Sequence, residues 1–206
     1  MDAPSVGAIV LAAGASERMG RRKQTLGYRD STMVRAVLGA ALGAGIGPVV
    51  LVAPPDDPSL ENAADGLEVS VVVNPDPSRG NLSSLRCGIE TVGAVDGVVL
   101  LLADMPQVGA ELVARLVWAW SVERPYAAVC TYRDVVSHPF LLSKPAIEDL
   151  AAAEGQQPLW RLLVEDPVTP VLRVEFDRTA PLDVDTPADY ERLLADEGLP
   201  SESGES

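Results

Sequence analysis

A turn of small residues and a cluster of basic residues near the start of the chain have the composition of a polyphosphate site. The turn at 11–16 (LAAGAS) continues an apolar run of strand length at Val6–Ala12. Small residues let the backbone approach a ligand closely and present amide hydrogens to phosphate oxygens. Six of the 16 basic residues fall between positions 18 and 35, namely Arg18, Arg21, Arg22, Lys23, Arg29 and Arg35. Because the whole chain carries a net charge of −14, this concentration of cations favours phosphate binding over the alternative, an exposed solubilising loop.

Two common phosphate-binding motifs are absent from this segment. A P-loop has the pattern GxxxxGK[ST], but here five residues separate Gly14 from Gly20, and Arg21 follows. A dinucleotide fingerprint needs GxGxxG directly after a strand, and residues 14–19 do not supply it. We therefore expect a phosphate-binding turn of another kind, and the missing fingerprint argues against an NAD-dependent dehydrogenase.

An aspartate that ends an apolar strand is the first predicted metal ligand. Residues 98–103 (VVLLLA) form a continuous apolar run, and Asp104 follows it directly. Open α/β sheets bind ligands at the carboxyl ends of their strands, where a carboxylate can hold Mg²⁺ against a substrate phosphate. Asp104 could instead cap the next helix, but that helix is predicted to begin several residues later, after Pro106. Its position therefore favours contact with a metal ion or a substrate.

A pair of carboxylates, Asp183 and Asp185, precedes the last predicted helix. Thr186 and Asp189 have the spacing of a helix N-cap and its N3 partner, which explains both residues structurally. That explanation does not cover the preceding pair, whose spacing of two places both side chains on one face of an extended segment. A lone carboxylate pair is usually solvated, so this signal depends on its combination with Asp104.

Two further segments carry weaker signals. The segment Gly80–Gly88 (GNLSSLRCG) combines a loop glycine, a helix start and a face with hydroxyl and Arg side chains, which could receive a base, a ribose or a phosphate. An ordinary capped helix explains it equally well. His138, the single histidine, precedes Pro139 and has no neighbours that would complete a catalytic triad.

These residues are predicted to stand on alternating strands and helices. Five apolar runs are predicted as strands: Val6–Ala12, Val49–Ala53, Val69–Val73, Val98–Ala103 and Ala127–Tyr132. Between them, helical patterns cover Thr32–Ala44, Ser59–Ala64, Asn81–Gly93 and Ala110–Val122. The alternation predicts an α/β fold with an open, mostly parallel sheet and helices on both faces. The second half is predicted to extend one edge, with strands at Pro139–Leu142 and Val171–Val174 and helices at Pro145–Glu154, Pro158–Glu165 and Pro187–Asp196.

Composition limits the class of protein. A chain of 206 residues that is 47% apolar suits one domain, predicted at 1–196, followed by a disordered acidic tail at 197–206. The charge of −14 argues against a nucleic-acid partner or an anionic membrane surface. Cys87 and Cys130, without a CxxC motif, exclude a zinc ribbon or a disulfide scaffold. Neither a signal peptide nor a transmembrane segment is predicted, so we expect a cytoplasmic protein.

Taken together, these segments resemble the MobA-like nucleotidyltransferases, most closely their molybdenum cofactor cytidylyltransferase branch. The motifs follow one another in order along nearly the whole chain: LAAGxSxRMGxxKQ at Leu11–Gln24, a GLSSSLRxG-like segment at Gly80–Gly88, LLADMP at Leu101–Pro106, HP at His138-Pro139 and DVDTPxDY at Asp183–Tyr190. The resemblance implies a Rossmann-like fold of the nucleotide-diphospho-sugar transferase type. It also implies transfer of a nucleotidyl group from an NTP to a phosphorylated acceptor, with release of pyrophosphate.

The resemblance assigns roles to residues. Lys23, Arg18 and Asp104 would be catalytic, Asp104 and Asp185 would hold Mg²⁺, with Asp183 in reserve, and His138 would contact the acceptor. The nucleotide would be bound by Leu11, Ala12, Ala13, Gly14, Ser16, Arg18, Lys23, Gly80, Ser83, Ser84 and Arg86. Transfer of this type depends on positioning and charge neutralisation more than on a protein nucleophile.

The substrates implied are CTP and molybdopterin. Ala13 in LAAG is similar to the cytidylyltransferases, whereas guanylyltransferases of the family tend to have LAGG. Departures from the pattern bear on the acceptor: Ser137 stands before His138 where the family has Gly, and residues 154–161 (EGQQPLWR) replace a GDxGAR motif. The alternatives are a guanylyltransferase acting on molybdopterin or another small phosphorylated acceptor, and a non-catalytic nucleotide-binding maturation factor for a molybdoenzyme.

Overall fold

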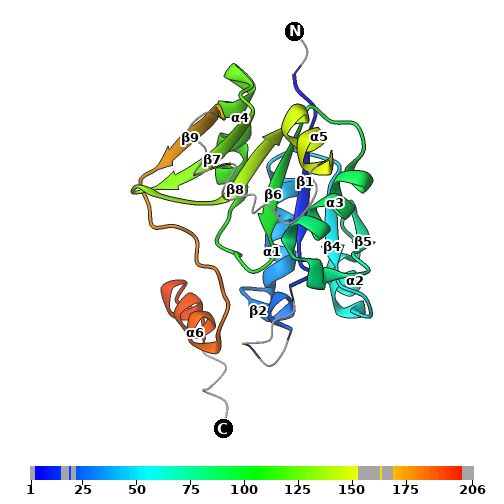
Figure 1. The fold of residues 1–206 in the computed structure, drawn as a ribbon. Coiled ribbons are helices and arrows are strands. Elements are labelled where there is room, and N and C mark those ends of the chain that lie inside the picture. Colours follow the sequence, from blue (N-terminus) through cyan, green and yellow to red (C-terminus); the bar gives the residue numbers. More distant parts are fainter. Residues whose placement is uncertain (1–2, 15–18, 20–21, 153–162, 164–168, 201–206) are drawn as a thin grey trace.

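The protein is built from short strands that alternate with helices along the chain. The computed structural model describes residues 3–14, 19, 22–152, 163 and 169–200 (Figure 1). The strands are β1 (Val6–Leu11), β2 (Gly27–Tyr28), β3 (Ser31–Thr32), β4 (Val49–Ala53), β5 (Val69–Val73), β6 (Gly97–Leu102), β7 (Ala127–Tyr132), β8 (Val135–Ser143) and β9 (Val171–Phe176). The helices are α1 (Met33–Gly43), α2 (Pro58–Ala64), α3 (Asn81–Val92), α4 (Ala110–Glu123), α5 (Lys144–Ala152) and α6 (Pro187–Asp196), with 3₁₀ turns η2 (Lys23–Thr25) and η3 (Pro77–Arg79).

One seven-stranded sheet in the order β5-β4-β1-β6-β8-β7-β9 forms the centre of the fold. Strands β5, β4, β1 and β6 are parallel, and β9 is parallel to β7. Strand β8 is antiparallel to both of its neighbours. The cause is the two-residue turn Arg133-Asp134 between β7 and β8, whose φ angles of 46° and 72° suit the tight turn that reverses a strand. The sheet is therefore mostly parallel with one reversed strand.

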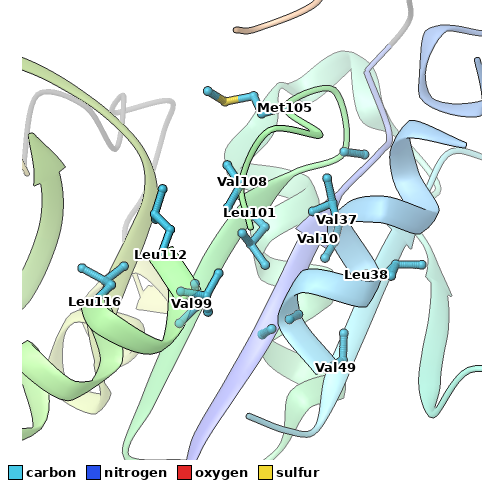
Figure 2. Close-up of a cluster of buried hydrophobic side chains, with 14 of the residues drawn as sticks. Val10, Val37, Leu38, Val49, Val99, Leu101, Met105, Val108, Leu112 and Leu116 are labelled. Carbon is cyan, nitrogen blue, oxygen red and sulfur yellow. The ribbon is translucent and has the colours of Figure 1, made fainter. Parts of the chain in front are cut away.

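Two hydrophobic cores lie on the two faces of this sheet. Along β1, Ala8 and Val10 belong to the first core and Ile9 to the second, because successive side chains point to opposite faces. Helices α1 and α4 pack on the first face, and Figure 2 shows their side chains, such as Val37 and Leu112, against those of β1 and β6. Helices α3 and α5 pack on the second face. The predicted α/β fold with helices on both faces is confirmed.

A third, smaller core joins the end of the chain to the segment after β1. In it Tyr190 and Leu193 of α6 pack with Tyr28 of β2, Met33 of α1 and Val184. The Tyr190 hydroxyl donates a hydrogen bond to the Gly27 carbonyl at 2.7 Å. Figure 1 shows α6 and β2 beyond the end of the sheet at which β1 finishes. The last helix therefore covers the carboxyl edge of the sheet rather than either face.

The element bounds agree closely with those expected from the sequence, with three differences. The sequence analysis did not predict the short hairpin formed by β2 and β3. Strand β8 begins at Val135, four residues before the predicted start, because the turn at 133–134 pairs it with β7 from its first residue. Glu197 and Leu199 belong to the segment predicted as a disordered tail, but both are held by hydrogen bonds to α6. The Leu199 amide, for example, donates to the Leu194 carbonyl at 2.8 Å. Residues 201–206 and nearly all of the predicted helix Pro158–Glu165 lie outside the described residues.

Candidate active site

The predicted site residues gather at the carboxyl edge of the parallel strands. Backbone hydrogen bonds continue past the strand ends, from the Ala12 amide to the Val52 carbonyl at 2.9 Å and from the Ala103 amide to the Leu11 carbonyl at 3.0 Å. These bonds fix the residues that follow β1 and β6, Gly14 and Asp104 among them. A rigid backbone at this edge is the usual place for a ligand in an open α/β sheet.

Asp104 is joined directly to the segment that carries the other two carboxylates. The Val184 amide donates to the Asp104 carbonyl at 3.1 Å, and the Val184 side chain is fully buried in the third core. Because side chains alternate along an extended segment, Asp183 and Asp185 then turn away from that core and toward Asp104. The oxygens of the three carboxylates lie within 4.8 Å of one another. The expectation that Asp104 and Asp185 lie close together agrees with this geometry, and Asp183, the reserve candidate, lies beside them.

Lys23 lies at the centre of this carboxylate cluster. Its Nζ is 2.6 Å from Asp104 Oδ2, 2.7 Å from Asp185 Oδ1 and 4.0 Å from Asp183 Oδ1. The lysine is buried at 6% exposure, and the 3₁₀ turn η2 sets its direction. Burial disfavours the ammonium form, but Asp104 and Asp185 outweigh burial, so the pKa of Lys23 lies above its ordinary value. Lys23 therefore remains a cation at neutral pH.

The cluster opens toward solvent on one side. The exposed fractions of the side chains increase from 17% for Asp104 to 32% for Asp185 and 52% for Asp183. Among the described residues, no donor reaches the buried Oδ1 of Asp104. An acceptor atom buried without a partner is costly unless something binds it. Three carboxylates with one unused buried oxygen have the donor chemistry of a Mg²⁺ or Mn²⁺ site, so the residues fit a hard divalent cation.

At residues 12–14, in the turn after β1, the side chains are buried or absent, so a ligand could contact only their backbone. The side chains of Leu11, Ala12 and Ala13 are buried, while Gly14 is exposed. A Cβ built on Gly14 would meet, among the described residues, only Gln24 Nε2 at 3.9 Å. Packing of those residues therefore does not require glycine there, and a backbone without a Cβ would let a ligand approach closely. Ser16 and Arg18, predicted to bind nucleotide, lie outside the described residues.

The described basic residues after this turn have different partners. Arg22 faces Asp57, with 3.2 Å between Nε and Oδ2, and Arg29 faces Glu197, with 2.6 Å between Nη2 and Oε2. Arg35 donates to backbone carbonyls at the end of α2. Lys23 forms ion pairs with the carboxylate cluster, whereas the ion pairs of Arg22 and Arg29 are with other carboxylates. Arg18 and Arg21 lie outside the described residues, so their part in a shared phosphate site remains a prediction.

The segment Gly80–Gly88 begins α3 at the same edge of the sheet. Gly80 precedes the helix with a φ of 83°, a conformation that favours glycine. Ser83 and Ser84 both accept hydrogen bonds from Asn74 Nδ2 at 2.9 Å. Arg86 donates instead to the Leu150 carbonyl of α5 at 3.3 Å. The role of these residues in nucleotide binding remains a prediction.

Asn74 is a buried polar residue that orders the predicted nucleotide-binding segment and that the sequence analysis missed. It follows β5 at the carboxyl edge, and its Oδ1 accepts from the Asp76 amide at 3.0 Å. It therefore fixes both the loop 74–80 and the hydroxyls that begin α3. A polar residue directly after a predicted strand, as with Asp104, is the sequence signal that could have found it.

His138 occupies a structural position in β8. Its Nδ1 lies 3.4 Å from the Leu100 carbonyl of β6, and its ring stacks on Phe140 with centroids 4.0 Å apart. Burial lowers the pKa of His138 to about 4, so the ring is neutral at physiological pH. The ring lies beside β6, two strands from the β1 turn in the sheet order. Contact with an acceptor remains a prediction.

Comparison with known proteins identifies the family of this chain. The MobA-like NTP transferase domain matches residues 8–169, which includes Lys23 and Asp104. The chain belongs to the MobA-like NTP transferase family. It is a nucleotidyltransferase with the Rossmann-like fold of the nucleotide-sugar transferase type, as the sequence predicts.

Three relatives show the range of this family. The molybdenum cofactor cytidylyltransferase of Escherichia coli (strain K12) is 24% identical over 90% of this chain and 94% of its own. The purine catabolism protein PucB of Bacillus subtilis (strain 168) is 27% identical over 94% of this chain and 98% of its own. The crystal structure of Rv0371c from Mycobacterium tuberculosis H37Rv is 37% identical, covers 95% of this chain and 100% of its own, and has a TM-score of 0.81. The same protein has also been solved in complex with manganese, with a TM-score of 0.78.

Among residues 3–14, 19, 22–152, 163 and 169–200, no helix is long and apolar enough to span a membrane.

Proposed function

We propose that the protein transfers CMP from CTP to a phosphorylated acceptor of the molybdopterin class and releases pyrophosphate. The observation that carries the proposal is Lys23, a buried cation held between Asp104 and Asp185 at the carboxyl edge of the sheet. A binding protein would need a cation for the phosphates, but it would not need three converging carboxylates beside that cation. This arrangement favours catalysis over a maturation factor without turnover.

In the proposed reaction the acceptor phosphate attacks the α-phosphorus of the nucleotide. A new P–O bond forms to the acceptor oxygen, the bond from the α-phosphorus to the α,β-bridging oxygen breaks, and pyrophosphate leaves with that electron pair. Backbone amides of residues 12–14 would orient the triphosphate, and Lys23 and Arg18 would neutralise its charge. Asp104 and Asp185, with Asp183 beside them, would hold Mg²⁺, which when bound offsets the negative charge that develops on the phosphate oxygens.

Lys23 would exchange partners when the nucleotide binds. It must release Asp104 and Asp185 before those oxygens can coordinate a metal ion, because its Nζ lies 2.6 and 2.7 Å from them. The triphosphate oxygens are negatively charged, like the carboxylates, and would take their place as partners of the ammonium. Metal and nucleotide would therefore favour each other's binding, although each would bind weakly alone.

Ala13 and the relatives support the choice of substrates. Ala13 is similar to the LAAG segment of the cytidylyltransferases, and one relative is a molybdenum cofactor cytidylyltransferase. The manganese complex of Rv0371c supports a divalent cation. Cys87 and Cys130 are free thiols, which fits the cytoplasm. A molybdoenzyme would be the partner that receives the product.

A pyrophosphate-release assay over the four NTPs, with molybdopterin present and absent, tests this proposal. We expect release that requires Mg²⁺ and molybdopterin and is fastest with CTP. A clear preference for GTP would establish the guanylyltransferase alternative. Release with CTP only when another phosphorylated acceptor is supplied would reject molybdopterin and keep the reaction type. No release with any NTP and acceptor, despite tight nucleotide binding, would favour the maturation factor.

A further inference from the structure

The side chain of Gln107 joins the two segments that carry the carboxylates. Gln107 lies three residues after Asp104 in the same loop, and its Oε1 accepts a hydrogen bond from the Leu182 amide at 2.9 Å. Leu182 directly precedes Asp183. One neutral side chain thus bridges the loop of the first carboxylate and the segment of the other two.

The orientation of the Gln107 amide is fixed by a second pair of contacts. Its Nε2 donates to Glu197 Oε1 at 3.1 Å, and Arg29 Nη2 donates to Glu197 Oε2 at 2.6 Å. A carboxylate only accepts and a backbone amide only donates, so the Gln107 amide satisfies both partners in one orientation alone. Glu197 is the C-cap residue of α6, and Arg29 follows β2, the strand after the Lys23 turn. The network therefore links the Asp104 loop, the segment before Asp183, the end of α6 and the residue after β2.

Among the described residues, three groups hold the backbone of the carboxylate segment, and Gln107 is the first. The second is the Asp104 carbonyl, which accepts from the Val184 amide at 3.1 Å. The third is Asp189 in the capping box of α6, which accepts from the Asp185 amide at 3.4 Å and from the Thr186 amide at 2.9 Å. Both of these hold residues after Asp183. Without Gln107, the chain on the amino side of Asp183 would lose its hydrogen bond to the Asp104 loop.

We propose that Gln107 is a positioning residue that sets the spacing of Asp183 and Asp185 from Asp104, and through it the affinity of the site for a divalent cation. This inference rests on the proposed function, because it takes the three carboxylates as the metal site. A residue that acts on metal ligands alone should change the metal requirement of the enzyme and leave its maximal rate almost unaltered.

Titration of Mn²⁺ against the full chain, followed by electron paramagnetic resonance, tests this inference with Gln107→Leu. We expect the dissociation constant for Mn²⁺ to rise about fivefold, the equivalent of one net hydrogen bond. In turnover, the Mn²⁺ concentration at half-maximal rate should rise by the same factor, while kcat at saturating Mn²⁺ stays within about twofold. Tyr126→Phe is the matched control, since it removes one hydrogen bond of 3.0 Å to Asp149 and leaves the site unchanged.

Glu197→Gln keeps the experiment decisive if Gln107→Leu folds poorly. This variant removes the charge pair with Arg29 but leaves an amide oxygen to accept from Gln107, so Mn²⁺ affinity should stay within about twofold. Equal Mn²⁺ affinity in Gln107→Leu and the wild type would overturn the inference and leave the proposed function intact. A fivefold loss in Glu197→Gln would also overturn it, because the charge pair would then be the cause. Mn²⁺ affinity of the wild type equal to that of Asp185→Asn would overturn the metal site itself, and with it both proposals.

Discussion

Lys23→Met should raise the affinity of the site for Mn²⁺ and lower its affinity for CTP. Methionine is similar in length but uncharged, so the variant empties the position between Asp104 and Asp185 without shortening the side chain. In the absence of nucleotide, Mn²⁺ should bind more tightly than to the wild type, because no ammonium has to be displaced. With Mn²⁺ saturating, CTP should bind more weakly, because a phosphate contact is lost.

The size of the first effect follows from the contacts that the metal would replace. Two charge-assisted hydrogen bonds, of 2.6 and 2.7 Å, hold the ammonium. Each contributes about 1.5–3 kcal/mol, and the lower value applies because the Asp185 side chain is 32% exposed. The sum of about 3 kcal/mol corresponds to roughly a hundredfold tighter binding, and solvent screening reduces this toward about tenfold.

Isothermal titration calorimetry with Mn²⁺ and then with CTP measures both effects. Arg22→Met is the matched control: it also removes one positive charge from the same segment, but Arg22 faces Asp57 instead of the carboxylate cluster. Its Mn²⁺ affinity should stay within about twofold of the wild type. Because unpaired carboxylates destabilise the metal-free variant, Mn²⁺ should also raise the Tm of Lys23→Met more than that of the wild type. Unchanged or weaker Mn²⁺ binding by the folded variant would refute the exchange of partners.

Four further substitutions test separate features of the protein. Asp104→Asn should keep the Tm within a few degrees and lower kcat by at least about a hundredfold in a pyrophosphate-release assay, since a neutral amide would hold Mg²⁺ weakly and the ion would then offset less phosphate charge. Gly88→Ala should lower the free energy of unfolding by about 1–3 kcal/mol in urea, because its Cβ would meet Ile9 Cγ2 at 2.5 Å, whereas Gly14→Ala should leave stability nearly unchanged and weaken CTP binding. His138, with a pKa lowered from 6.5 to about 4, binds its proton more readily in the unfolded chain. The stability advantage of the wild type over His138→Asn, measured in urea, should therefore be complete above pH 6.5 and fall by up to about 3 kcal/mol as the pH drops to 4. A pH-independent difference would contradict the burial of a neutral ring.

The sequence predicts the sheet well because its inner strands are buried on both faces. The largely apolar runs Val49–Ala53 and Ala127–Tyr132 are buried throughout and have the predicted bounds in the structure. The reversed strand β8 was harder to predict in full, because its pairing depends on the left-handed backbone of Arg133 and Asp134. Neither residue is the Asn or Gly that commonly marks such a turn.

The sequence predicts that Asp104 and Asp185 converge, but it does not predict their contacts with Lys23 or the bridge formed by Gln107. Asp104 ends a strand and Asp185 precedes a capped helix, so local patterns place both backbones. The position of Lys23 depends on the third core, where α6 packs on the segment after β1, and such long-range packing leaves no local pattern. Gln107 was missed for the same reason, since its partners Leu182 and Glu197 are 75 and 90 positions away along the chain.

The most direct test of the central claim follows the phosphorus atoms of the substrate. The wild-type protein is incubated with Mg²⁺, molybdopterin and CTP labelled at either the α- or the γ-phosphate. If Lys23 and the three carboxylates support nucleotidyl transfer, the α-label will appear in the acceptor and the γ-label in pyrophosphate, and neither transfer will occur with Asp104→Asn. Release of the γ-label as inorganic phosphate, with the α-label left in the nucleotide, would contradict the account.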